Sequence, residues 1–176
     1  KKFLIIDDFE NFHGILKRML HSLNASDIDT AVTGNQAIKL CEGKKYDVIF
    51  GDFDLGKGRN GLQVLEELRE KSLLKSSTAY IMTTAESSKE AVVGSLEYKP
   101  DAYLAKPFSV GELKARLLKV LKQKDALSKV HHAIDQKQFE EAIQACDEQI
   151  SQQTRHKSWC LKTKCSLLMK LRRFKD

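Results

Sequence analysis

Four apolar segments of this chain are each followed by side chains that could handle a phosphoryl group or a metal ion. The segment Leu4-Ile5-Ile6 precedes two acids, a second segment ends on a third acid, and a hydroxyl and an ammonium group follow the other two. The side chains concerned are Asp7, Asp8, Asp52, Thr84 and Lys106. If these segments are parallel strands of one sheet, their carboxyl ends lie at one edge, and the side chains form one site.

The negative charges of the three acids give a separate reason to expect a bound cation. Carboxylates are ionised at pH 7, and they repel one another when they are packed together without a cation. Oxygen ligands suit Mg²⁺, which keeps several waters beside its carboxylate ligands. The sequence therefore predicts that Asp7, Asp8 and Asp52 share a divalent cation.

The apolar segments alternate with stretches of helical periodicity, which indicates a parallel sheet whose strands are joined by helices. Strands are predicted at 3–8, 28–32, 46–52, 78–83 and 102–104. Helices are predicted at 12–23, 37–41, 62–68, 88–96 and 109–121, the last with Ser109 and Glu112 at capping-box spacing. Five such strands suit an α/β fold of the flavodoxin-like (βα)5 type, a doubly wound parallel sheet in the order 2-1-3-4-5. In that order the first and third strands are neighbours, so the acids at their ends are expected to meet.

Beyond residue 122 the strand signals stop. The chain contains neither Pro nor Gly from residue 112 onward, which favours helix throughout. Phe139-Glu140-Glu141-Ala142 and Phe174-Lys175-Asp176 are spaced 35 residues apart, close to the period of helix-pair repeats. We therefore expect an α/β domain at 1–122 and an all-α helical-repeat region at 123–176. Since the chain lacks an initial Met and ends within a helical pattern, we expect that region to be truncated.

The composition is that of an ordinary globular protein, with 41% hydrophobic and 31% charged residues. The formal net charge of +6 is spread over both halves of the chain, and no aromatics interleave with the basic run near its end, so nucleic-acid binding is not favoured. The four cysteines form no CxxC pair. With no secretory signal and no apolar span long enough to cross a bilayer, a cytoplasmic location fits best.

Residues 3 to about 122 resemble a two-component response regulator receiver domain of the CheY-like type. The motifs that carry the resemblance are Leu4-Ile5-Ile6-Asp7-Asp8, Asp47-Val48-Ile49-Phe50-Gly51-Asp52, Thr84-Ala85 and Tyr103-Leu104-Ala105-Lys106-Pro107-Phe108. The tail resembles a tetratricopeptide (TPR) repeat, with Phe139, Ala142 and Cys146 in one helix and Trp159 and Leu161 at the start of the next. The four receiver motifs follow one another along the chain in the same order as in the receiver family.

The resemblance implies a role for each acid. Asp52 would be the nucleophile and phosphoacceptor, because a carboxylate can attack phosphorus without a general base. Asp7, Asp8, Asp52 and the backbone carbonyl of Asp54 would bind Mg²⁺. The family usually has Met-Pro after the phosphoacceptor segment, where this chain has Leu55-Gly56, and this departure concerns the conformation of the loop.

The resemblance also implies the groups that respond to phosphorylation. Lys106 and the hydroxyl of Thr84 would contact phosphoryl oxygens, and Tyr103 would be the aromatic side chain that moves with the switch. The peptide bond between Lys106 and Pro107 would be cis, as is common in the family.

The function implied is that of a response regulator in a two-component phosphorelay. It would accept a phosphoryl group from a sensor histidine kinase or phosphotransfer protein and relay the switch to a helical output region that binds a protein partner. Such a protein is not an enzyme beyond self-phosphorylation from a donor and autodephosphorylation. The family often forms homodimers, and no membrane partner is implied.

Two other functions stay open on the sequence. Asp52-Phe53-Asp54 resembles the DxD motif of haloacid dehalogenase-like phosphatases, although that class places its metal-binding acids after the lysine, and here Asp7 and Asp8 precede it. The chain could instead be the receiver part of a DNA-binding transcription regulator whose output domain is truncated. Chain order argues against the first, and the lack of a helix-turn-helix pattern after Lys122 argues against the second.

Overall fold

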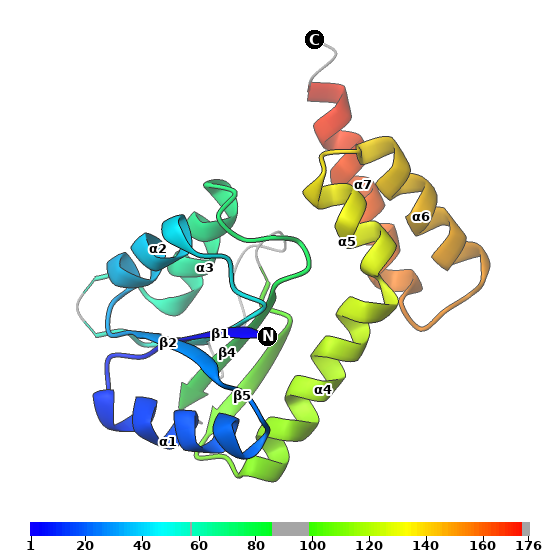
Figure 1. Ribbon diagram of the computed structural model, residues 1–176. Coiled ribbons are helices and arrows are strands. Elements are labelled where there is room, and N and C mark those ends of the chain that lie inside the picture. The colour runs from blue at the N-terminus through cyan, green and yellow to red at the C-terminus, as the bar shows by residue number, and fades with distance from the viewer. Residues whose placement is uncertain (57, 86–98, 174–176) are drawn as a thin grey trace. The chain divides into compact units, whose positions relative to one another are not determined.

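The computed structural model describes residues 1–56, 58–85 and 99–173, and these form two compact units, Lys1–Leu121 and Lys122–Asp176. The first unit holds a five-stranded sheet, and the second is helical (Figure 1). The helix predicted at 88–96 lies outside the described residues. Among the described helices, none is both long and apolar enough to cross a membrane.

All strand pairs in the sheet are parallel, and the order is β2-β1-β3-β4-β5. The strands are β1 (Lys2–Ile6), β2 (Asp27–Ala31), β3 (Val48–Asp52), β4 (Ala79–Ala85) and β5 (Ala102–Lys106). The predicted order and the flavodoxin-like fold are confirmed. Because β1 and β3 are neighbours, Asp52 at the last position of β3 lies at the same edge as the residues that follow β1.

Two boundaries differ from the predicted strands in ways that matter for the site. The first strand ends at Ile6, because the Asp7 carboxylate accepts a hydrogen bond from the Phe9 amide, 2.9 Å away, and the chain turns there toward the first helix. The fifth strand continues to Lys106, which pairs with Ala85 of β4. Lys106 is therefore held by the sheet, whereas Asp7 and Asp8 lie in the turn beyond it.

Helices cover both faces of the sheet (Figure 1). On one face, α1 (Glu10–Ser22) and α4 (Val110–Ala126) bury leucines against the sheet, among them Leu16 and Leu113. On the other face, α2 (Gly34–Gly43) and α3 (Gly61–Glu70) do the same with Ile38 and Leu65. Most residues of β1, β3 and β4 are buried on both faces, and that explains why these three strands are largely continuous apolar runs, whereas the edge strands β2 and β5 are only partly buried.

Side-chain caps begin three of these helices. Thr33 accepts a hydrogen bond from the Gln36 amide at the start of α2, and Asn60 forms a reciprocal capping box with Gln63 at the start of α3. The capping box predicted for Ser109 and Glu112 is present, with the Glu112 amide donating to the Ser109 hydroxyl and the Ser109 amide donating to the Glu112 carboxylate. Such caps satisfy backbone N–H groups that have no partner within the helix.

The second unit contains α5 (Ser128–Asp135), α6 (Phe139–Ser151) and α7 (Lys157–Arg173), and so it is helical as predicted. Helix α6 packs against both of its neighbours. Two small apolar clusters join the three helices. One is centred on Leu127, Val130, Cys146 and Cys160, and the other on Ala133, Ala142 and Leu167.

Candidate functional site

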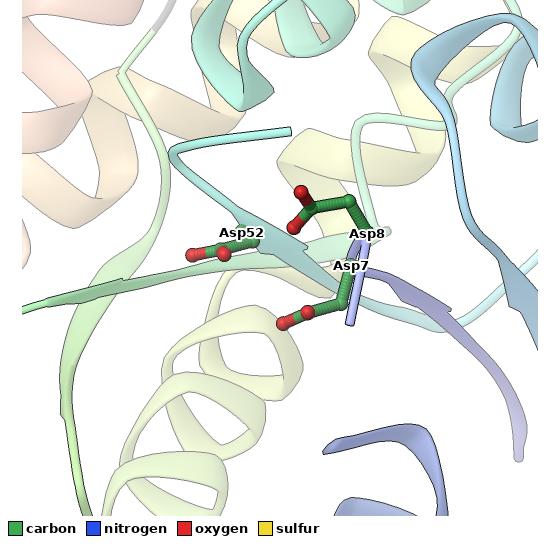
Figure 2. Close-up of side chains that lie close together, drawn as sticks. All are labelled: Asp7, Asp8 and Asp52. Carbon is green, nitrogen blue, oxygen red and sulfur yellow. The ribbon is translucent and has the colours of Figure 1, made fainter. Parts of the chain in front are cut away.

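Three carboxylates converge at the carboxyl edge of the sheet. Asp7 and Asp8 follow β1 and Asp52 ends β3, and one oxygen from each lies within 4.8 Å of the others (Figure 2). Asp7 is 1% exposed and Asp52 is 9% exposed, whereas Asp8 is exposed to solvent. The cluster therefore has a buried side within the protein and an open side at Asp8.

Lys106 lies between the two buried acids. Its ammonium nitrogen is 2.6 Å from an Asp7 oxygen and 2.9 Å from an Asp52 oxygen. The ion pair joins the end of β5 to the ends of β1 and β3, so it holds together residues 99 positions apart in the chain. One positive charge among three carboxylates leaves this site with a net negative charge.

The groups around Asp52 shift its pKa in opposite directions. Burial raises the pKa of Asp52 above its usual value, hydrogen bonding to Lys106 lowers it, and the negative charge of Asp7 raises it again. The raised pKa means that the protein does not fully compensate the charge on this carboxylate. A bound cation would favour the ionised form.

The donor set fits magnesium. All three side chains offer carboxylate oxygens, which are hard ligands, and the exposed position of Asp8 leaves room for the waters that Mg²⁺ retains. Asp54 is also exposed, and its carboxylate accepts a hydrogen bond from the Gly56 amide at 3.0 Å. Its side chain thus serves the local turn, so a role for Asp54 would fall to its backbone carbonyl.

Gly56 stands in the loop after Asp52, where this chain has Leu55-Gly56 in place of the usual Met-Pro, and its backbone conformation accounts for the glycine. Its φ of +67° lies in the left-handed region that glycine adopts at little cost. A Cβ at this position would lie 3.0 Å from a carboxylate oxygen of Asp8. The loop therefore passes close to the acid cluster at a residue without a side chain.

Tyr80 is a residue of the site that sequence reasoning missed. This tyrosine of β4 is fully buried, and its hydroxyl donates to the carbonyl of Gly61 at 3.1 Å. The Gly61 amide in turn donates to the carbonyl of Phe53, which closes the loop that follows Asp52. A Cβ on Gly51 would lie 2.2 Å from the Tyr80 hydroxyl. The glycine within an otherwise apolar strand was the signal that could have revealed this arrangement.

Helix α1 contributes two further residues that were missed. The Phe12 ring lies beneath the Lys106 ammonium group, 4.3 Å from ring centroid to nitrogen, and packs edge-on against Phe108. His13 is buried, and its Nε2 lies 2.7 Å from the backbone oxygen of Asp7. The sequence showed Phe12 only as part of an apolar helix face. The helix starts against the acid cluster and turns the His13 side chain inward, which helical spacing alone does not indicate.

The remaining predicted site residues lie near the same edge without a described contact to the three acids. Thr84 pairs with Ala105 between β4 and β5, and its hydroxyl donates to the Ala85 carbonyl at 3.2 Å. Tyr103 is half-buried and packs against the cluster that lies under α2 and α3, and burial raises its pKa. The peptide bond between Lys106 and Pro107 is cis.

Comparison with known proteins gives consistent matches over the first unit. Residues 3–118 match the family model of the response regulator receiver domain. The chemotaxis protein CheY-3 of Vibrio cholerae is 28% identical over 122 residues, which are 69% of this chain and 92% of that protein. The transcriptional regulatory protein PhoP of Bacillus subtilis, which is named for alkaline phosphatase synthesis, is 34% identical over 125 residues, 71% of this chain and 50% of PhoP.

A solved structure agrees with the sequence matches. The Vibrio cholerae chemotaxis protein CheY4 has a TM-score of 0.61 and 25% identity, covering 68% of this chain and 98% of that structure. The residues matched by the family model include the five strands, the three acids and the lysine described above. The chain belongs to the response regulator receiver domain family.

Proposed function

We propose that this protein is a phosphorylation-activated switch in which Asp52 accepts a phosphoryl group and the second unit is the output region. The observation that carries this proposal is the position of Asp52 at the end of β3, beside two further acids and an ammonium group. Membership of the receiver family supports it. The haloacid dehalogenase alternative loses its basis, because the family match includes the acids that precede the lysine.

In the proposed reaction an Asp52 carboxylate oxygen attacks phosphorus. A new oxygen–phosphorus bond forms, and the bond from phosphorus to the nitrogen of a donor phosphohistidine breaks, leaving its electron pair on that nitrogen. Burial and the neighbouring charge of Asp7 raise the pKa of Asp52, so the free carboxylate is less stabilised by the protein. A less stabilised carboxylate would be a better nucleophile.

The surrounding groups would position the transferred phosphoryl group. Asp7, Asp8, Asp52 and the Asp54 carbonyl would hold Mg²⁺, which when bound offsets negative charge on the phosphoryl oxygens. Lys106 already lies 2.9 Å from Asp52 and would move its ammonium group onto a phosphoryl oxygen.

The response would begin at β4 and β5. A phosphoryl group adds nearly two negative charges, and the hydroxyl of Thr84, which follows the β4 partner of Asp52, would turn toward it. Movement of Thr84 would make room for the half-buried ring of Tyr103, which would change its position in response. The protein would exchange between two conformations before phosphorylation, and phosphorylation would increase the population of one of them.

The output would be a protein contact made by the TPR-like second unit. Helix α4 ends at Ala126 and α5 begins at Ser128, so a single residue, Leu127, separates these two helices along the chain. The upstream partner would be a histidine kinase or phosphotransfer protein. PhoP is named as a transcriptional regulator, but the alignment covers half of it, so a DNA-binding output gains no support from that similarity.

Labelling with acetyl phosphate tests the site. Wild-type protein is expected to incorporate phosphate in the presence of Mg²⁺ and to lose most incorporation when EDTA is added. Asp52→Asn should not be labelled, whereas Asp54→Asn is the matched control, since Asp54 is close by but exposed and uses its carboxylate locally. Equal labelling of wild type and Asp52→Asn would refute the assignment.

A further inference from the structure

His13, in the first part of α1, is joined to the backbone of the acid cluster by one short hydrogen bond. Its Nε2 lies 2.7 Å from the carbonyl oxygen of Asp7, and the side chain is buried. A carbonyl oxygen can only accept, so Nε2 carries the hydrogen and His13 is the donor. The carbonyl belongs to the peptide group that joins Asp7 to Asp8. The bond therefore acts on the backbone between two of the three acids.

Asp7 is also fixed by contacts at its amide and at its side chain. The Asp7 amide donates to the carbonyl of Ala31 at 3.0 Å. Its carboxylate accepts from the Lys106 ammonium group at 2.6 Å and from the Phe9 amide at 2.9 Å. Because β1 ends at Ile6, the Asp7 carbonyl lies beyond the strand, and a carbonyl buried in the protein needs a partner. His13 supplies that partner.

Asp8 depends on its backbone for its place in the cluster. The residue is exposed, and within the ranges that the structure describes no hydrogen bond or ion pair reaches its carboxylate. Its side chain leaves the turn in a different direction from that of Asp7 (Figure 2). A peptide group is planar, so a bond that holds the Asp7 carbonyl also holds the amide nitrogen of Asp8. His13 therefore restrains the backbone from which the Asp8 side chain projects.

Helix α1 begins without the kind of cap that α2 and α3 have. Phe9 occupies its N-cap position and makes no side-chain cap hydrogen bond, whereas Thr33 and Asn60 cap the other two helices. The bonds described above join the start of α1 to the turn instead, with the Phe9 amide on the Asp7 carboxylate and the His13 ring on the Asp7 carbonyl. The same bonds that anchor the helix thus also fix the acids.

We propose that His13 is a positioning residue of the metal site, which holds the Asp7–Asp8 peptide so that the Asp8 carboxylate stays directed at the ion. This inference rests on the proposed function, because it assigns a role toward the Mg²⁺ that the acids would bind. The Nε2 hydrogen of His13 is committed to the Asp7 carbonyl, so the residue acts through the backbone and not as a ligand. Loss of a group that orients metal ligands typically weakens metal binding by roughly 10- to 100-fold.

Isothermal titration calorimetry of the full chain with magnesium chloride tests this role. His13→Leu removes the donor and keeps a side chain of similar bulk, and it should weaken Mg²⁺ binding about tenfold. His13→Gln offers an amide N–H at a similar reach and should restore most of the affinity. Should His13→Leu fail to fold, His13→Met repeats the test, because it also lacks a donor and its flexible side chain adapts to the same space.

His21 provides a matched control within the same helix. It lies at the other end of α1, and its Nδ1 is 2.8 Å from the carbonyl oxygen of Ala25. His21→Leu therefore removes a contact of the same kind without touching the acid cluster, and Mg²⁺ affinity should stay at the wild-type value. Thermal unfolding in EDTA, followed by far-ultraviolet circular dichroism, identifies a temperature at which all variants are folded, and the titrations are made there.

Labelling with acetyl phosphate distinguishes positioning from general damage to the fold. His13→Leu should be labelled slowly at low Mg²⁺ and at the wild-type rate at saturating Mg²⁺, because His13 orients a metal ligand and contacts no phosphoryl group in the proposed reaction. A rate that stays low at saturating Mg²⁺ would contradict the role.

Three binding results would overturn the inference. They are equal Mg²⁺ affinity in wild type and His13→Leu, an equal loss in His13→Gln and His13→Leu, and an equal loss in His21→Leu and His13→Leu. The first would leave the proposed function intact, since the acids would still bind Mg²⁺. Labelling of Asp52→Asn would instead refute the proposed function, and a difference in Mg²⁺ affinity between the His13 variants would stand.

Discussion

Acidification should selectively destabilise the helical unit through His131. This side chain of α5 is 2% exposed and packs against the Trp159 ring, with 5.2 Å between centroids. Burial lowers the pKa of His131 from 6.5 to about 3, and the positive charge of Lys124 acts in the same direction. Between pH 6.5 and about 3 the imidazole is therefore neutral in the folded unit, whereas the unfolded chain would protonate it.

The sign and size of the effect follow from proton linkage. Between pH 6.5 and about 3 the unfolded chain binds a proton that the folded unit does not, so stability is full above pH 6.5 and is lost as the pH falls. The shift from 6.5 to about 3 corresponds to a maximum of about 5 kcal/mol, at about 1.4 kcal/mol for each pH unit. At pH 5 the loss relative to pH 7 is about 2 kcal/mol.

Urea unfolding followed by tryptophan fluorescence measures this loss directly, because Trp159 is the single tryptophan of the sequence and lies in this unit. Wild type should lose about 2 kcal/mol more than His131→Leu between pH 7 and pH 5, since leucine cannot take up the proton. His132→Gln is the matched control at an exposed neighbour and should behave as wild type. Equal losses in wild type and His131→Leu would refute the reasoning.

Three substitutions near the acid cluster have separable outcomes. Tyr80→Phe removes the buried hydrogen bond to the Gly61 carbonyl and should lower the free energy of unfolding by about 1–3 kcal/mol in a denaturant titration; an unchanged value would contradict the role given to that bond. Gly56→Ala should weaken Mg²⁺ binding in isothermal titration calorimetry, because the new Cβ would crowd Asp8 at a positive φ, and equal affinity would count against the fit. Phe12→Leu removes the ring beneath the site lysine, worth about 0.5–2 kcal/mol, and should slow acetyl phosphate labelling without changing Mg²⁺ affinity; labelling at the wild-type rate would show that the ring does not position the lysine.

The sequence by itself determined the strand order and the convergence of the three acids. Apolar runs that alternate with helical stretches admit few arrangements, because parallel strands need right-handed crossovers and both faces must be covered. Once β1 and β3 are neighbours, Asp7, Asp8 and Asp52 must meet at one edge. The capping box at Ser109 could also be predicted from the sequence, because it depends on two residues that are three positions apart.

Other parts of the site were decided only by tertiary packing. Tyr80 reaches Gly61 because Gly51 leaves room for its ring, and residues on different strands produce that fit. Phe12 and His13 face the cluster because of where α1 begins, which their helical spacing does not specify. In the second unit, periodicity predicts helices, but the same apolar pattern is buried in α5 and exposed in α7. A one-dimensional pattern records which side chains can be buried, whereas burial itself depends on a partner element that the pattern does not contain.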